Sequence, residues 1–154
     1  MMKRKILVDA DACPVAAEIC RVARNVEMEA AFFSDRHRIL NLPDGAIVTY
    51  INPGPQAVDL ALWHAAAPGD IAITQDHGLA CLLLGKKVTV VTPSGMIIND
   101  RNIEGLIERR HLAMKERRRG RRTRGPRPFS LEQRERFVRN LEKVARGKDD
   151  VEGN

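Results

Sequence analysis

The chain alternates short apolar segments with helical patterns, and this alternation constrains its fold more than any other feature. The apolar segments lie at residues 6–8, 30–33, 46–51, 71–74 and 88–91. Most of them are apolar at consecutive positions, as expected for strands that are buried on both faces. Helical spacing of apolar residues follows the first, third and fourth segments. The pattern predicts an α/β fold, with a mostly parallel sheet flanked by helices.

The part of the chain after residue 102 follows a different pattern. A helix expected from Asn102 runs into an arginine-rich segment, and Ser130 and Gln133 have the spacing of a capping box that starts a last helix. We therefore divide the chain into an α/β domain (1–114), a basic arm (115–128), a C-terminal helix (129–147) and a disordered tail (148–154). The last helix is too short for a core of its own, so it docks on the body or on another subunit, which leaves a homo-oligomer open.

The positive charge is concentrated in one segment. The whole chain has a net charge of +6, yet residues 1–108 carry 10 basic and 13 acidic side chains, whereas residues 109–127 carry 10 basic and one acidic. Such asymmetry indicates a polyanionic partner. We expect nucleic acid, with RNA favoured, and the arginines expected to contact its backbone are Arg117, Arg118, Arg119, Arg121, Arg122 and Arg124.

Several classes of protein are disfavoured by composition. No stretch of about 20 apolar residues exists, and the apolar run near the N-terminus is too short for an export signal. The three cysteines (Cys13, Cys20 and Cys81) are odd in number and lack a C-x-x-C motif, which argues against a disulfide framework and a thiolate zinc site. We expect a cytoplasmic protein without a membrane association.

The carboxylates are the most informative candidates for chemistry. Asp9 and Asp11 follow the first expected strand, Asp76 follows the fourth, and Asp100 follows the fifth after a short loop. Asp59 lies inside an expected helix, where aspartate is unfavourable. Strand ends of a parallel sheet share one edge, so these acids can converge and repel one another unless a cation intervenes. Oxygen ligands of this kind predict Mg²⁺ or Mn²⁺.

Each acid also has an ordinary structural explanation. Asp11 can cap the first helix, and Asp76 can cap the helix expected near residue 79. Asp59 can point to solvent beside the apolar stripe of its helix. The joint arrangement of the acids favours a metal site over these separate explanations.

Long motifs in the chain resemble the YaiI/YqxD family of bacterial proteins, which lack an established function. The resemblance covers residues 4–118 and rests on the segments ILVDADACP (6–14), AVD (57–59) and PGDIAITQD (68–76). That family in turn looks like the PIN-domain nucleases, which have a three-layer sandwich fold. The likeness implies metal-dependent cleavage of RNA, with Asp9, Asp59 and Asp76 as the catalytic and metal-binding acids.

The resemblance leaves some roles open. It gives Asp100 as a fourth metal ligand and Asp11 as a supporting ligand or cap, and the helix acid falls on either Asp59 or Glu18. A phosphatase of the haloacid-dehalogenase type is an alternative, with Asp9 as the nucleophile and with Ser34 and Lys86 in later roles. A nucleic-acid-binding protein without catalysis is the third hypothesis.

Overall fold

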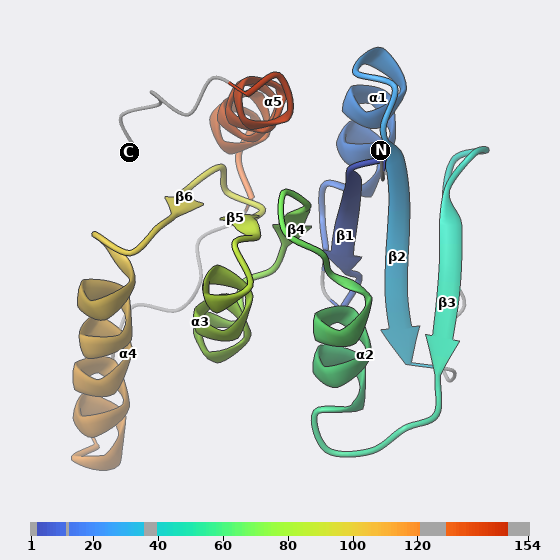
Figure 1. The fold of residues 1–154 in the computed structure, drawn as a ribbon. Coiled ribbons are helices and arrows are strands. Elements are labelled where there is room, and N and C mark those ends of the chain that lie inside the picture. Colours follow the sequence, from blue (N-terminus) through green and yellow to red (C-terminus); the bar gives the residue numbers. More distant parts are fainter. Residues whose placement is uncertain (1–2, 12, 36–39, 121–128, 148–154) are drawn as a thin grey trace.

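The fold is known from a computed structural model that describes residues 3–11, 13–35, 40–120 and 129–147. The described residues form a six-stranded sheet in the order β3-β2-β1-β4-β5-β6 (Figure 1). All neighbouring strands are parallel except β5 and β6, which are antiparallel. The strands are β1 (Lys5–Asp9), β2 (Glu29–Asp35), β3 (Ile47–Ile51), β4 (Ile71–Ile73), β5 (Thr89–Val91) and β6 (Ile97–Ile98).

Helices cover both faces of this sheet. The helices are α1 (Ala16–Asn25), α2 (Ala57–Ala65), α3 (His77–Gly85), α4 (Ile103–Arg118) and α5 (Leu131–Ala145). One core joins α1 and α5 to the sheet residues Ile6, Val8 and Ile73. The other core joins α2, α3 and α4 to Leu7 and Ala72. Adjacent strand residues point to opposite faces, so each buried strand supplies both cores. The predicted α/β fold with a mostly parallel sheet is confirmed.

The C-terminal helix docks on the body of its own chain. Ser130 and Gln133 form the predicted capping box at its start. Arg134 of α5 donates to the Pro14 carbonyl at 2.7 Å and pairs with Glu18 of α1 at 2.9 Å. Phe137 is fully buried in the core between α5 and the sheet.

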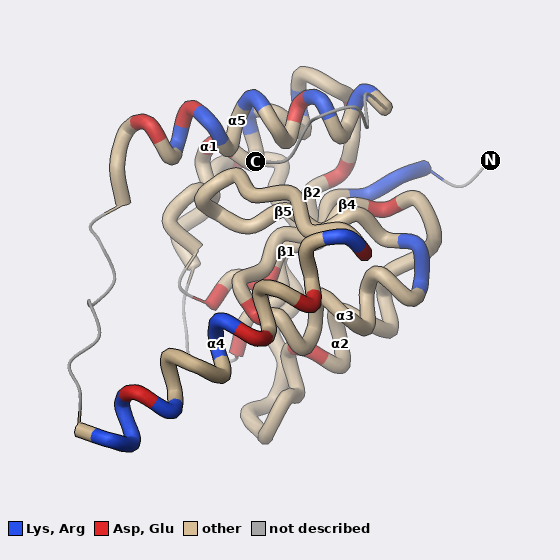
Figure 2. The backbone as a smooth tube through the Cα atoms, turned by 90° about the vertical axis from the view of Figure 1, so that its left-hand side faces the viewer, with Lys and Arg blue, Asp and Glu red and all other residues tan. Residues whose placement is uncertain are grey.

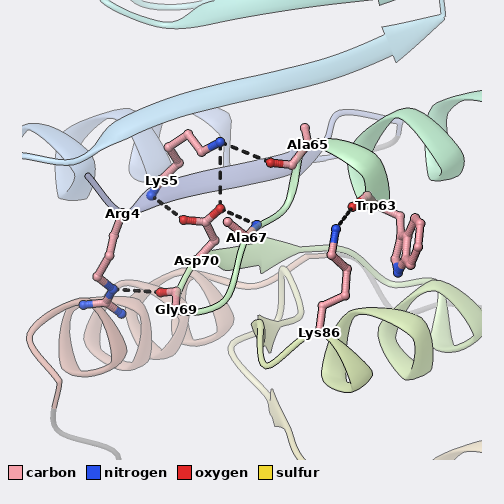
Figure 3. Close-up of polar contacts among 8 residues, drawn as sticks. All are labelled: Arg4, Lys5, Trp63, Ala65, Ala67, Gly69, Asp70 and Lys86. Atoms are coloured by element: carbon pink, nitrogen blue, oxygen red, sulfur yellow. Dashed lines mark hydrogen bonds and ion pairs between the residues drawn. The ribbon is translucent and has the colours of Figure 1, made fainter. Parts of the chain in front are cut away.

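The edge of the sheet at which the strands begin is closed by structural contacts (Figure 3). Asp70 is 2% exposed and accepts hydrogen bonds from the backbone N–H groups of Lys5 and Ala67, both at 2.9 Å. Lys86, after α3, donates to the Trp63 carbonyl at 2.7 Å, and its ammonium lies 4.4 Å from the centroid of the indole ring. These contacts hold β1, α2 and α3 together at this edge. The predicted site acids Asp9 and Asp76 follow the strands at the opposite edge.

Strand β6 and the C-terminal part of helix α4 add to what the sequence predicts. The strand β6 was not predicted, because two isoleucines after a turn give too short a pattern. Helix α4 continues past residue 114 to Arg118, so the first part of the predicted basic arm is helical. The rest of the arm, from residue 121, and the tail (148–154) lie outside the described residues. No described helix is long and apolar enough to cross a membrane.

Candidate functional site

The first site residue is positioned by the register between β1 and β4. That register pairs Val8 with Ile73, so the next residues, Asp9 and Thr74, lie side by side. The Thr74 hydroxyl, which is almost fully buried, donates to Asp9 Oδ2 at 3.1 Å. The backbone N–H of Asp11 approaches Asp9 Oδ1 at 3.3 Å. Asp9 is therefore held at the carboxyl edge, the edge at which the parallel strands end.

The same threonine positions the second acid. The backbone N–H of Asp76 donates to Thr74 Oγ1 at 3.0 Å, so one hydroxyl connects the Asp9 side chain to the Asp76 main chain. Asp76 caps α3, because its Oδ1 accepts from the Leu79 N–H at 3.0 Å. The sequence expectation that Asp76 caps this helix is confirmed. A cap uses one carboxylate oxygen and leaves the charge of the group for another task.

The third acid comes from α2, which packs on β1 and β2. Asp59 is half-buried in the first turn of this helix, whose buried anchor is Leu62. A carboxylate in a first turn interacts favourably with the helix dipole. The expected cost of a mid-helix aspartate therefore does not apply, because the helix begins only at Ala57.

Electrostatic interactions show that these three carboxyl groups are neighbours. Burial and the negative charges of Asp76 and Asp9 raise the pKa of Asp59 to about 6. Burial also raises the pKa of Asp9, against the hydrogen bonds from Asp11 and Thr74 that lower it, and the charges of Asp11 and Asp76 raise it further. We call Asp9, Asp59 and Asp76 the acidic site.

The donor atoms of the acidic site fit a hard divalent cation. Each side chain offers carboxylate oxygens, and the raised pKa values of Asp9 and Asp59 show that the negative charge is poorly compensated by the protein. Across the described residues, no group of three or more His, Cys, Asp or Glu side chains is already arranged to hold a metal ion. Mg²⁺ commonly binds only one or two carboxylates and completes its coordination shell with water. The carboxylates of the acidic site are therefore ligands of the kind that Mg²⁺ uses.

Other predicted site residues lie differently. Asp11 is exposed in the turn after β1, and the helix α1 starts later and has no side-chain cap, so Asp11 does not cap it. The charge of Asp11 acts on Asp9 and Asp59. Glu18 lies on α1, on the opposite face of the sheet from α2, and it pairs with Arg134. Of the two alternatives for the helix acid, the structure brings only Asp59 to the other acids.

The structure does not bring Asp100 to the site. Because β6 is antiparallel to β5, with Val90 opposite Ile98, the residues after β6 return to the edge where β5 begins. Asp100 accordingly lines a cavity with Lys87 and Thr89 at that edge. The expectation that Asp100 joins the other acids assumed a direct connection from β5, and the unpredicted strand reverses the chain.

The described arginines of the basic arm lie at one end of α4. Arg117, Arg118 and Arg119 are exposed there, whereas the buried anchors Ile103 and Leu106 lie in its first turns (Figure 2). In Figure 1, α4 runs in the same direction as the arrows of β1, β2 and β3, so this basic end points toward the carboxyl edge. Arg121, Arg122 and Arg124 lie outside the described residues.

Thr74 is the functional candidate that sequence reasoning left out. Thr74 lies two residues before Asp76 in the segment PGDIAITQD, and of the two only Asp76 is assigned a role from the sequence. The spacing of Thr74 and Asp76 was the available signal. Only the register with β1 shows that the hydroxyl also reaches Asp9.

Comparison with known proteins gives a consistent family. A family model described as "Uncharacterized BCR, YaiI/YqxD family" matches residues 7–147. A UPF0178 protein of Halalkalibacterium halodurans is 36% identical over 91% of this chain and 89% of its own length. Another of Lachnoclostridium phytofermentans is 42% identical over 75% and 77%, and one of Staphylococcus epidermidis is 36% identical over 93% and 97%. No solved structure matches at a significant level. The chain belongs to the YaiI/YqxD family.

Proposed function

We propose that this protein is a divalent-metal-dependent nuclease that hydrolyses phosphodiester bonds, with RNA as its substrate. The observation that carries the proposal is the meeting of Asp9, Asp59 and Asp76, which come from three separate elements, with Thr74 linking Asp9 to Asp76. Burial, together with the charges of Asp76 and Asp9, raises the pKa of Asp59 to about 6. A fold that gathers carboxylates at this cost is typical of a cation site or a catalytic site. The resemblance to PIN-domain nucleases points to the same chemistry.

Each residue of the acidic site has a distinct task in this proposal. Asp9 and Asp76 would hold Mg²⁺ or Mn²⁺, and Asp59 and Asp11 would interact with its remaining water. Thr74 keeps the Asp9 oxygen and the Asp76 backbone in a fixed relation through hydrogen bonds of 3.1 and 3.0 Å. When bound, such a cation supplies activation of water and neutralises charge on the leaving oxygen.

RNA would be held by its backbone beside the acidic site. Arg117, Arg118 and Arg119 are exposed at the end of α4 that points to the carboxyl edge. Guanidinium groups bind phosphates in a bidentate way. Residues 1–108 carry more acidic than basic side chains, and the excess of positive charge lies in residues 109–127. Attraction of the polyanion therefore depends on this end of the molecule, while the acids repel it until a cation is present.

The metal and the reaction are tested with a charge-only substitution. Asp76→Asn keeps a side-chain oxygen that can cap α3, so the fold is preserved while one negative charge is removed. Asp100→Asn is the matched control, because it removes the same charge at the opposite edge. Calorimetry with Mg²⁺ and Mn²⁺ should show binding to the native chain and to Asp100→Asn, and at least tenfold weaker binding to Asp76→Asn.

Cleavage is followed on end-labelled single-stranded RNA. We expect products with Mg²⁺ or Mn²⁺, none in chelator, and a rate lowered by about 100-fold or more in Asp76→Asn. RNA binding without cleavage under any divalent cation would leave a non-catalytic binding protein as the function. Absence of both metal uptake and cleavage in the native chain would refute the proposal.

The basic end of α4 is tested by its salt dependence. Replacing Arg117, Arg118 and Arg119 by alanine should weaken RNA binding and reduce the slope of log affinity against log salt by about 2, since each phosphate contact contributes about 0.7 for single strands. Alanine at three exposed residues, Arg139 and Lys143 of α5 and Arg146 directly after it, removes the same charge elsewhere. Equal losses in both triple variants would refute a specific role for α4.

The phosphatase alternative has less support. Lys86 was its candidate for a later role, but this residue follows the C-terminal end of α3, whereas Asp76 caps the N-terminal end. A helix of nine residues separates the two by about 13 Å. The ammonium is also engaged by the Trp63 carbonyl and indole ring. We therefore favour hydrolysis without a covalent intermediate on Asp9.

A further inference from the structure

A cavity of about 610 Å³ lies at the carboxyl edge, next to the acidic site. Gln75 and His77, which flank Asp76 in the chain, form one side of it. The loop after β5 forms another side, with Ser94 and Met96, and Leu106 of α4 and Phe129 before α5 also line it. Its volume lies in the range of small-molecule sites, about 300–1,000 Å³.

The described part of the cavity lining is mixed in polarity. None of the described residues that line it is Asp, Glu, Lys or Arg. Pro93, Met96, Leu106 and Phe129 give apolar surface, while amide and hydroxyl groups come from Gln75 and Ser94. Among these described residues a phosphate would find no cation, whereas an uncharged flat ring with polar atoms at its rim would find both kinds of partner.

One lining group lacks an internal partner. His77 Nδ1 is buried and has no hydrogen-bond partner. Among the residues that the structure describes, no other buried side-chain nitrogen or oxygen lacks a partner. An orphaned buried polar atom costs free energy. Because His77 lines the cavity, a turn of its imidazole would present Nδ1 to a ligand there. His77 follows Asp76 directly, so a ligand that reaches this atom would lie close to the acidic site.

We propose that this cavity binds the nucleobase of a nucleotide whose phosphate lies at the acidic site. This inference rests on the proposed function for the place of the phosphate, and it adds a base subsite to it. Gln75 would donate to or accept from the edge of the base, His77 Nδ1 would complete its hydrogen bonding there, and Met96 and Phe129 would contact its faces. The nuclease would then prefer certain bases beside the cleaved bond.

The subsite is tested with mononucleotides, which contain no phosphodiester bond and are therefore not turned over. The full chain is titrated, in Mg²⁺ and in chelator, with AMP, GMP, CMP and UMP, and with ribose 5-phosphate, which has the sugar and phosphate but no base. Backbone NMR signals of Gln75, His77 and Met96 should shift with at least one nucleotide, and ribose 5-phosphate should bind about tenfold more weakly or worse. Equal binding of ribose 5-phosphate would overturn the inference.

Two variants locate the binding. Gln75→Ala, at an exposed residue, should weaken the preferred nucleotide by about fivefold through the lost hydrogen bond. Met96→Trp, with its fold checked by circular dichroism, should fill the cavity and abolish binding. Asn41→Ala, an exposed amide outside the cavity, is the control. Unchanged affinity in both cavity variants would overturn the subsite.

The same experiments separate this inference from the proposed function. Nucleotide binding at the cavity in a chain that cleaves no RNA with any divalent cation would sustain the subsite and refute the nuclease. RNA cleavage with unchanged rate and base preference in both cavity variants would sustain the nuclease and refute the subsite.

Discussion

Replacing Asp59 by asparagine should make the protein more stable at neutral pH and have little such effect in acid. Asp59 is half-buried beside Asp76 and Asp9, and its pKa is raised to about 6 from an ordinary value of 3.8. The folded state thus disfavours the charged form. Asparagine has nearly the same shape, can still donate a hydrogen bond toward Asp76, and carries no charge to repel its neighbours.

The size of the effect follows from the shift and the exposure. A shift of about two pKa units corresponds to about 3 kcal/mol if it is fully expressed. Since the side chain is partly exposed, solvent screening reduces this to about 1 kcal/mol. The pKa of Asp59 is higher in the folded than in the unfolded state. The loss of folding stability that its charge causes is therefore absent below pH 3.8, grows between pH 3.8 and about 6, and is complete above that.

Urea unfolding in chelator, from pH 4 to pH 8, measures this directly. The difference in unfolding free energy between Asp59→Asn and the native chain should rise by about 1 kcal/mol over the range, which is roughly 2–4 °C in Tm. Asp100→Asn, which removes a carboxylate at the opposite edge, is the control. A flat or falling difference for Asp59→Asn would show that neither burial nor the neighbouring acids disfavour its charged form, and the argument for a cation site would fail.

Three further predictions concern the framework of the site, and each is measured by urea unfolding at pH 7. Asp70→Ala should cost about 3 kcal/mol, because two backbone N–H groups lose a buried acceptor. Gly95→Ala should cost about 2 kcal/mol, because φ is 95° and a Cβ would lie 2.8 Å from the Phe137 nitrogen, whereas Gly105→Ala, in open space on α4, should be neutral or stabilising. Ser130→Ala should cost about 1 kcal/mol through loss of the capping box. Losses under about 0.5 kcal/mol in Asp70→Ala, Gly95→Ala and Ser130→Ala would contradict these assignments.

The layered fold could be predicted because the strands are short and apolar on both faces. The segment Ile6–Val8 supplies Leu7 to one core and Val8 to the other, so consecutive apolar residues are required on both sides. Such strands are typical of parallel sheets that are covered by helices on both faces. The same logic predicts that Asp9 and Asp76 reach one edge, since both follow strands that run in the same direction.

The placement of Asp100 could not be predicted because it depends on the direction of a two-residue strand. Ile97 and Ile98 pair with Val91 and Val90 in an antiparallel way, which returns the chain to the other edge. No periodicity exists in two residues, so the sequence pattern is the same whether the segment forms a strand or a loop.

The relation among the acids depends on atoms that a residue pattern does not contain. Asp9 and Asp76 are 67 positions apart, and the link between them is one hydroxyl, which donates to the first and accepts from the main chain of the second. A shift of the β1–β4 register by one residue would pair Asp9 with Ile73 or Gln75 and turn its carboxylate away from Thr74. The packing of Leu7 in one core and Val8 in the other favours the observed register. The packing of the cores therefore fixes the geometry of the charged edge, and the repulsion among its acids is sustained by the buried strands beneath it.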